Sequence, residues 1–566
     1  MNFSRPKVVD AGIVLAASVV LVLFRLHAFA LPLETDEANY AYIGARLLDG
    51  DRLYLEVWDH QPPGVFMLFA GAIAIFGDSP VVFRWLATAF SAASLALIFA
   101  ILRRMSGRPA ATLGAILFCM VSSDPGTGGE GANREIYMNT FILAAWWLAL
   151  RGWANVCEIA PLIPNDRSLP HFFYGPCSPG QRFLFTFASG LALGIASLFK
   201  TNVAVYWVFL AVWIAVQAWI FDPTKRTRMM LTALAGFALG PVLVWDATLA
   251  YFAASNRTHE FVEAIFLVNL DYARDGGSFF SRFWTFFDPP RFEHIFDSAF
   301  PLWIGAAAAL AWLLTTAIVR PSAAIVQVVA LVLAGYIAVC LPGRFWPHYY
   351  YLLIPPAVIA VTLFIVALLH ASAEIIPRRK RTAAVAVIAS GLIVAVLLAS
   401  EYKHYLSKDG LDITFYRYNT RDFWGKAQGE NVARVISPGD SVFVYGNDAA
   451  IYYYSKRKSA SRYTMITGLY PQIRGAAERQ QNLITDLRES RPRIILVLLD
   501  LDPFPEWLSL LEEQYGPAIA WDTHDVTDEP IMFVFTRKDA PIEPIDWSWD
   551  RSEVMPKSDE KKGEKH

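Results

Sequence analysis

A series of apolar stretches, each long enough or nearly long enough to cross a bilayer, is the feature that most constrains this chain. About 20 apolar residues in a row span the hydrocarbon core as a helix. Of the 566 residues, 55% are hydrophobic and 18% are charged, so we expect a polytopic α-helical membrane protein. The eleven expected spans are 11–31, 81–102, 109–122, 137–152, 183–199, 201–221, 229–253, 300–319, 322–341, 349–370 and 382–400.

The distribution of positive charge orients these spans. Sixteen Lys and Arg residues fall on one side, in the segments 1–10, 103–108, 151–182, 222–228, 320–321 and 377–381. The segments on the other side are about twice as long in total and hold fewer cations. Because cytoplasmic loops are enriched in Lys and Arg, we expect the amino terminus inside and the C-terminal part outside. The net charge of −2 indicates no nucleic-acid partner.

The composition changes near residue 401. Strands are expected at 441–446, 493–500 and 531–537, with helices at 471–489 and 503–515 between them. We therefore expect three parts. They are a transmembrane domain (1–400) with outer loops at 32–80, 123–136 and 254–299, a soluble α/β domain (401–538), and a charged, disordered tail (539–566).

The cysteines, the first apolar run and the search for repeats give no sign of a disulfide framework in the α/β part, a cleavable signal peptide or a transporter. Cysteines occur at 119, 157, 177 and 340, none of them in the α/β part, so no disulfide framework is predicted there. The first apolar run is too long for a cleavable signal peptide and lacks a small-residue cleavage site. No inverted repeat favours a transporter.

Two adjacent carboxylates follow the first span, in LPLETDEANYAYIGARLLDG. The pattern predicts a helix with Thr35 as N-cap, Asp36 and Glu37 in its first turn, and Gly50 as its stop. We expect an amphipathic helix on the membrane surface. Stabilisation of the helix dipole would explain these acids without any chemistry.

Other polar residues fall on the same expected side. They are His60 and Gln61 in EVWDHQPPG, Glu135, Lys200, and Arg344, His348 and Tyr349 in GRFWPHYYY. Each has a simpler explanation, such as a snorkelling cation, an aromatic belt or a solvated loop histidine. Together they resemble a site for an anionic lipid headgroup, with cations to hold a phosphate and a carboxylate to accept a proton.

TDEANYAYIGARLLDG followed by WDHQPPG resembles the first outer loop of the GT-C glycosyltransferases. It is most similar to the bacterial branch of the protein mannosyltransferase family (glycosyltransferase family 39/83 type), which includes the lipid A aminoarabinose transferase. NREIYMNTF, the Lys200 turn and GRFWPHYYYLLIPP are similar to later landmarks, so the resemblance covers about residues 10–370. The C-terminal α/β domain also fits this architecture.

The resemblance implies a polyprenyl-phosphate-linked sugar as donor, with transfer on the non-cytoplasmic face of a bacterial inner membrane. It implies that Asp36 is the catalytic base, that Glu37 helps it or organises the loop, and that Glu135 is a second acid. His60 and Gln61 stand where relatives carry an acid or histidine followed by lysine. Because Gln61 supplies no positive charge, holding the phosphate passes to Lys200 or Arg344.

One carboxylate and one or two cations are sufficient for such a transfer reaction. The enzyme must deprotonate an acceptor and hold the charge of the leaving phosphate. A single displacement would invert the anomeric centre, unlike catalysis by a retaining pair of carboxylates. Asp36, Glu135 and His60 are also suitable ligands for a divalent metal such as Mg²⁺, Mn²⁺ or Zn²⁺. The expected acceptor is a lipid or glycan in the membrane.

Three other hypotheses remain open at this point. A polysaccharide polymerase or ligase would use a lipid-pyrophosphate donor and more outer arginines. A lipid-linked sugar transporter would need charged or broken-helix features at mid-membrane depth, whereas Arg25 and Asp246 lie near the outer ends of their runs. A structural subunit would leave the outer polar residues unexplained.

The placement of Lys and Arg predicts the side on which the α/β domain lies. A reporter that is active only outside the cytoplasm should be active when fused after Asp500. A reporter that works only in the cytoplasm should be silent at the same position. The reverse pattern would contradict the orientation.

Overall fold

The protein is described by a computed structural model. It describes residues 5–153, 178–221, 225–288, 295–296, 299–319, 323–375, 396, 421–498, 503–517, 519–523 and 530–547. The expected span at 382–400 lies outside these residues, apart from residue 396. The described chain divides into two compact units, and each is presented separately below.

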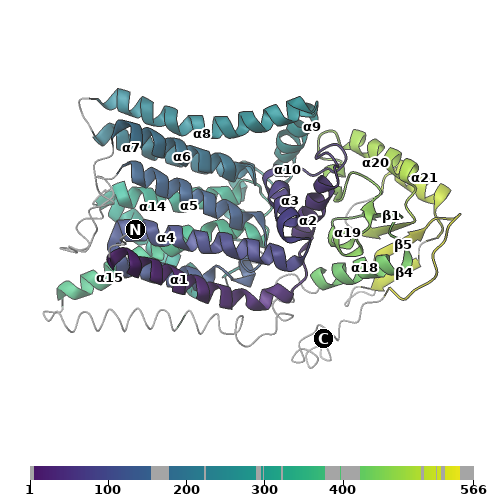
Figure 1. The fold of residues 1–566 in the computed structure, drawn as a ribbon, viewed down its shortest axis with the longest axis horizontal. Coiled ribbons are helices and arrows are strands. Elements are labelled where there is room, and N and C mark those ends of the chain that lie inside the picture. Colours follow the sequence, from purple (N-terminus) through teal and green to yellow (C-terminus); the bar gives the residue numbers. More distant parts are fainter. Residues whose placement is uncertain are drawn as a thin grey trace. The chain divides into compact units, whose positions relative to one another are not determined.

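Unit 1 comprises residues 1–29, 84–250 and 277–408 and is helical throughout its described part. Apart from the short α11 (Phe279–Thr285), which lies in the expected outer loop 254–299, its helices coincide with expected spans. The others are α1 (Arg5–Arg25), α4 (Pro80–Val121), α5 (Arg134–Gly152), α6 (Pro179–Ser197), α7 (Ala204–Phe221), α8 (Arg226–Ala254), α13 (Phe300–Val319), α14 (Ala323–Cys340) and α15 (Ile354–Ile375). Figure 1 shows α5, α6, α7 and α8 side by side.

Helix α4 contains two of the expected spans. Its backbone leaves the helical region at Gly107, where φ is +89°. A Cβ added to Gly114 would overlap the Leu102 side chain. Residues twelve apart in a straight helix would be about 18 Å apart. The halves before and after Gly107 therefore fold back on each other, at the Arg-rich turn expected between the two spans.

Glycines bring helices α6 and α8 into close contact. A Cβ at Gly190 would overlap the carbonyl oxygen of Phe237, and one at Gly194 would lie 2.9 Å from the Pro241 Cα. The spacing of four residues puts both glycines on one face of α6. Small residues at this spacing let two helix backbones approach closely inside a membrane.

Many large apolar side chains of unit 1 face outward. Leu15 of α1, Val208 of α7 and Ile318 of α13 are 67%, 63% and 81% exposed. In water such surfaces would be costly, whereas lipid solvates them. Six helices among the described residues are long and apolar enough to cross a membrane. The chain is thus a multi-pass membrane protein, as expected.

Unit 2 combines residues 30–83 and 251–276 with the C-terminal part from 409. The first segment forms α2 (Thr35–Leu48) and α3 (Gly64–Phe76). The second forms α9 (Thr258–Val262), the π-helix η6 (Glu263–Val268) and α10 (Asn269–Asp275). Helix α2 packs against α3 on one side and against α19 (Ala450–Ser455) of the C-terminal part on another.

The C-terminal part is an α/β domain with a five-stranded sheet in the order β2-β1-β3-β5-β4. Strand β1 pairs in parallel with β2 and β3, whereas β5 pairs antiparallel with β3 and β4. The strands are β1 (Ser441–Tyr445), β2 (Lys458–Ser459), β3 (Ile494–Leu498), β4 (Ile519–Thr523) and β5 (Pro530–Thr536). The expected strands and helices are confirmed here, and β2 and β4 are additional.

Helices cover both faces of this sheet. Helices α20 (Ala476–Ser490) and α21 (Pro505–Gln514) lie on one side of it and α18 (Arg421–Val435) on the other (Figure 1). Trp507 of α21 stacks on Tyr445 of β1 at 4.3 Å between ring centroids and is buried. Because β1 and β3 are buried on both faces, their sequences are apolar without alternation.

Three sequence-based expectations are corrected within unit 2. The N-cap of α2 is Glu34 rather than Thr35. Helix α2 is expected from its sequence to lie on the membrane surface with one open face. Instead, all residues from Glu37 to Gly44 are buried. The start of the expected disordered tail is packed on the domain, since Trp547 is buried and its carbonyl accepts a hydrogen bond from the Gln428 side chain.

Candidate functional site

The first turn of α2 treats its two acids differently. Glu34 and Glu37 form a reciprocal capping box, and Glu37 Oε2 accepts a hydrogen bond from the Glu34 backbone N–H at 3.1 Å. Glu37 is fully buried. Asp36 is only partly buried, and the Tyr40 hydroxyl lies 3.4 Å from its Oδ2 one turn along the helix. Glu37 thus organises the helix start, and Asp36 keeps a side chain that solvent can reach.

The loop between α2 and α3 is organised by Asp59. Its carboxylate accepts hydrogen bonds from the Asn39 amide at 2.6 Å and from the Gln61 backbone N–H at 2.8 Å. Its Oδ1 also lies 3.5 Å from His60 Nδ1. The Gln61 and His60 side chains lie 2.9 Å apart. His60 and Gln61 are therefore held in one arrangement by an acid that is itself buried.

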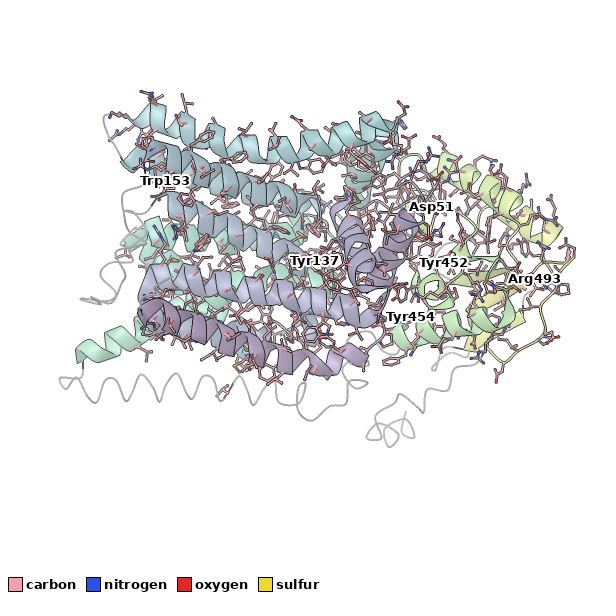
Figure 2. The ribbon with its side chains drawn as sticks, viewed as in Figure 1. Asp51, Tyr137, Trp153, Tyr452, Tyr454 and Arg493 are labelled. Atoms are coloured by element: carbon pink, nitrogen blue, oxygen red, sulfur yellow. The ribbon has the colours of Figure 1, made fainter. Side chains whose placement is uncertain are left out.

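The α/β domain supplies further partners for α2. The Tyr42 ring lies against Tyr452 of α19, and its hydroxyl accepts a hydrogen bond from the Ser459 N–H at 2.8 Å. At the end of the helix, Asp51 lies 3.6 Å from the Lys458 ammonium. Figure 2 labels Asp51 and Tyr452. Residues some 400 positions apart in sequence thereby meet within unit 2.

Unit 1 holds a separate charged cluster around Glu135, in the first turn of α5. Lys200 Nζ lies 3.1 Å from Glu135 Oε1, and Arg134 Nε lies 3.6 Å from the same oxygen. The Lys200 ammonium also sits over the Tyr349 ring, 3.0 Å from its centroid. Tyr137, two residues further along α5, lies at the opposite end of this helix from Trp153 (Figure 2). The cluster thus lies at one end of α5.

Electrostatics keep Glu135 ionised. Burial would raise the pKa of its carboxyl, but the charges of Lys200, His348 and Arg134 outweigh burial and lower the pKa to about 2. His348 and Tyr349 lie together in the 3₁₀ helix η7 (Pro347–Leu353). Glu135 is therefore unsuited to accept a proton near neutral pH, because its conjugate acid is too strong.

Arg344 lies in a short loop between two residues in the left-handed region. The φ angles of Gly343 and Phe345 are +69° and +52°. Arg282 of α11 fixes the start of this loop by donating to the Leu341 carbonyl at 2.7 Å. Burial lowers the pKa of the Arg282 guanidinium, and the positive charge of Arg344 lowers it further. Arg282 is thus bonded to the loop that carries Arg344, and its guanidinium is affected by the positive charge of Arg344, an arrangement that favours an anion.

A metal ion at Asp36, Glu135 and His60 stays an expectation, because these residues belong to two units that are described separately. Among the residues that the structure describes, no three His, Cys, Asp or Glu side chains form a group that could hold one. Glu135 Oε1 already lies close to two cations, Lys200 and Arg134. We therefore derive no catalytic step through a metal.

The structure brings the expected site residues into two groups. Asp36, Glu37, His60 and Gln61 belong to unit 2, whereas Glu135, Lys200, Arg344, His348 and Tyr349 belong to unit 1. Sequence reasoning missed the hydrogen bonds of Asn39 and Asp59. Asn39 carried a usable signal, because a residue three positions after Asp36 shares its helix face.

Residues 60–156 match the family model described as dolichyl-phosphate-mannose-protein mannosyltransferase. A search of curated proteins found no significant match to the chain.

Three solved structures are similar in fold. ArnT from Cupriavidus metallidurans in the apo state is 16% identical, with a TM-score of 0.58 over 95% of this chain and 100% of ArnT. ArnT bound to undecaprenyl phosphate is 14% identical, with a TM-score of 0.54 over 95% and 99%. Archaeoglobus fulgidus AglB, in complex with an inhibitory peptide and a dolichol-phosphate, is 13% identical, with a TM-score of 0.50 over 94% and 74%.

The buried ion pair generates a stability prediction. Lys200→Met should lower the unfolding temperature, because removing one partner of a buried pair typically costs about 3–5 kcal/mol. The double variant Lys200→Met/Glu135→Gln should recover much of this loss, since no buried carboxylate is left without its main partner. Thermal unfolding in detergent measures both. A double variant less stable than the single one would contradict this account.

The pH dependence of the same pair has a definite sign. The folded pKa of Glu135 lies below its ordinary value of 4.5, so its contribution to stability is complete above pH 4.5 and is lost as the pH falls towards 2. Changing the pH between 6 and 8 should leave this contribution unchanged.

Proposed function

We propose that the chain is a membrane glycosyltransferase of the GT-C type, related to the protein mannosyltransferases, and that it uses a polyprenyl-phosphate-linked sugar as donor. It transfers the sugar to an acceptor in the membrane with inversion at the anomeric carbon. The fold is shared with ArnT, whose structure holds undecaprenyl phosphate, and with AglB, whose structure holds a dolichol-phosphate.

The proposed reaction is a single displacement. Asp36 takes the proton of an acceptor hydroxyl or amine while the acceptor atom attacks the anomeric carbon. The bond between that carbon and the phosphate oxygen breaks, and the polyprenyl phosphate leaves with the electron pair. Cations stabilise the charge that develops on the phosphate. No second carboxylate is needed as a nucleophile.

One observation carries the assignment of the base. Asp36 and Glu37 are adjacent in the first turn of α2, but Glu37 is fully buried and engaged in the capping box, whereas Asp36 is partly exposed. A group that exchanges a proton with a substrate must be reachable by it, so Asp36 suits this role better. The acid expected in the second loop, Glu135, is held ionised by its cations and suits an electrostatic role instead.

The phosphate contacts are proposed to come from Arg344 and Lys200. Arg344 lies in a loop whose start is bonded to the Arg282 guanidinium, and a phosphate would relieve the repulsion between the two cations. Lys200 is already in contact with Glu135 and Tyr349, so it contributes a partly neutralised charge. We therefore assign the larger part to Arg344. His348 and Tyr349 complete the proposed binding residues on unit 1.

We further propose that the chain lies in a bacterial inner membrane with Asp36 and the α/β domain on the periplasmic side. The uneven distribution of Lys and Arg over the loops supports this orientation. Unit 2 contains both the Asp36 loop and the α/β domain, so the two belong on the same side of the membrane.

Replacing the base tests the mechanism most directly. Asp36→Asn keeps the shape of the side chain but cannot accept a proton, so the rate of transfer should fall by about 10²–10⁴. Donor binding and the level of protein in the membrane should be unchanged. Transfer from a radiolabelled polyprenyl-phosphate sugar, with purified enzyme, measures the rate.

Glu37→Gln is the matched control for Asp36→Asn. Glutamine keeps an oxygen for the Glu34 N–H, and so preserves the capping box. It should retain transfer within a few-fold. An Asp36→Asn enzyme as active as Glu37→Gln would remove Asp36 from the mechanism.

The donor contacts generate a second prediction. Arg344→Ala should weaken binding of polyprenyl phosphate by at least tenfold, and Arg344→Lys should restore it only in part, because a fork of donors becomes a point charge. Lys200→Ala should have the smaller effect. Binding by titration in detergent tests this, and unchanged affinity in both alanine variants would rule the assignment out.

A further inference from the structure

We propose that Thr464 of the α/β domain is a positioning residue for the loop that carries the base, and that it acts through Asn39. This inference rests on the proposed function, because it takes Asp36 as the base. It assigns to the C-terminal domain a role in catalysis rather than only in binding or stability.

A series of side-chain hydrogen bonds begins at Thr464, which is fully buried. Its hydroxyl donates a hydrogen bond to the Asn39 Oδ1 at 2.7 Å. The Asn39 Nδ2 donates in turn to Asp59 at 2.6 Å. A hydroxyl on one side and a carboxylate on the other fix the amide in a single orientation, because only one flip satisfies both neighbours. All three residues lie in unit 2.

Two members of this hydrogen-bonded series, Asn39 and Asp59, lie next to residues of the proposed site. Asn39 follows Asp36 by three positions on α2 and so lies on the same face of the helix. Asp59 accepts the Gln61 backbone N–H and lies beside His60. Fixing the Asn39 amide therefore fixes α2 and the 59–61 loop relative to each other.

Other contacts show that the domain holds the start of α2 as well. The Leu33 N–H donates to the Tyr454 hydroxyl at 2.8 Å, and the Thr35 hydroxyl donates to Asp448 at 3.2 Å. Figure 2 labels Tyr454. These bonds lie on either side of Glu34, three and one residues before Asp36. The base thus stands on a helix that the α/β domain holds at its start and along its length.

The loop after α2 also contacts the α/β domain through a strand-like pairing at Trp58. The Trp58 N–H donates to the Arg462 carbonyl at 2.9 Å, and Trp58 packs edge-on against Tyr463. Thr464 follows directly, so the 58–59 and 462–464 segments run alongside each other. Because these backbone contacts persist without the hydroxyl, removing it should disturb the orientation of Asn39 without detaching the loop.

The test compares two substitutions at Thr464 with a control in the same segment. Thr464→Val removes the hydroxyl and keeps the branched shape, whereas Thr464→Ser keeps the hydroxyl. Thr467→Val is the control, because the Thr467 hydroxyl also donates to an asparagine Oδ1, at 3.2 Å, but its partner is Asn447 inside the domain. Each variant is the full-length chain in nanodiscs.

Two readouts keep the inference separate from the proposed function. Thr464→Val should lower kcat by about ten- to a hundredfold with little change in the KM for the donor, since misplacement by about 1 Å can cost 10²-fold. It should also speed hydrogen exchange several-fold in peptides that cover 34–48 and 57–64. Thr464→Ser should resemble the wild type in both readouts, and so should Thr467→Val.

The outcomes divide clearly. Exchange in 34–48 and 57–64 that is the same in Thr464→Val and Thr467→Val would overturn the positioning role, whatever the activity. Faster exchange with a normal kcat would overturn it too, because the loop would then move without consequence. A wild-type enzyme that transfers no sugar from polyprenyl-phosphate donors would instead contradict the proposed function, while the exchange data would still report whether Thr464 orders the loop.

Discussion

The cost of burying charge in apolar surroundings governs where this protein can keep polar residues. A charge away from water must be paired or bonded, and in lipid no solvent substitutes for a partner. Arg25, near the end of α1, accordingly donates to the Ser122 carbonyl and to the Ser123 hydroxyl. Glu135 and Lys200 satisfy each other in the same way. Such pairs collect at helix ends, where a first turn or a short loop offers partners.

This constraint distinguishes charged side chains that stabilise the fold from those that are placed to react with a substrate. A charge that is fully engaged by its neighbours stabilises the fold but is poorly placed to react. Glu37 belongs to this class through its capping box, and Glu135 through its cations. Asp36 differs because its side chain remains partly exposed. The contrast between two adjacent acids on one helix turn is the strongest physical reason to assign the proton transfer to Asp36.

The α/β domain is part of one compact unit with the segment that carries Asp36. Its contacts with the 30–83 segment include backbone bonds, a tyrosine pair and the buried Thr464–Asn39 bond. A helix of fourteen residues such as α2 is marginal by itself in water. Packing on α3 and on the domain supplies the stability that the isolated segment lacks, and it makes the orientation of Asp36 depend on residues far along the chain.

Local sequence patterns were sufficient for the elements. The apolar runs located the helices of unit 1, and the Arg-rich turn at 103–108 anticipated the reversal at Gly107. The strands at 441–445, 494–498 and 530–536 were also anticipated, because each is a short apolar run bounded by polar residues. The N-cap was missed by one residue, since a reciprocal box between Glu34 and Glu37 competes with the threonine.

What the sequence by itself determined was the membrane class, the position of the helices and the α/β domain. These follow from hydrophobicity and periodicity, which are local properties of the chain. Only the tertiary structure decided that Glu37 is engaged, that Lys200 is paired with Glu135, and that Thr464 reaches Asn39. Side chains 65 and 425 residues apart meet because of packing, and no local pattern records such a meeting.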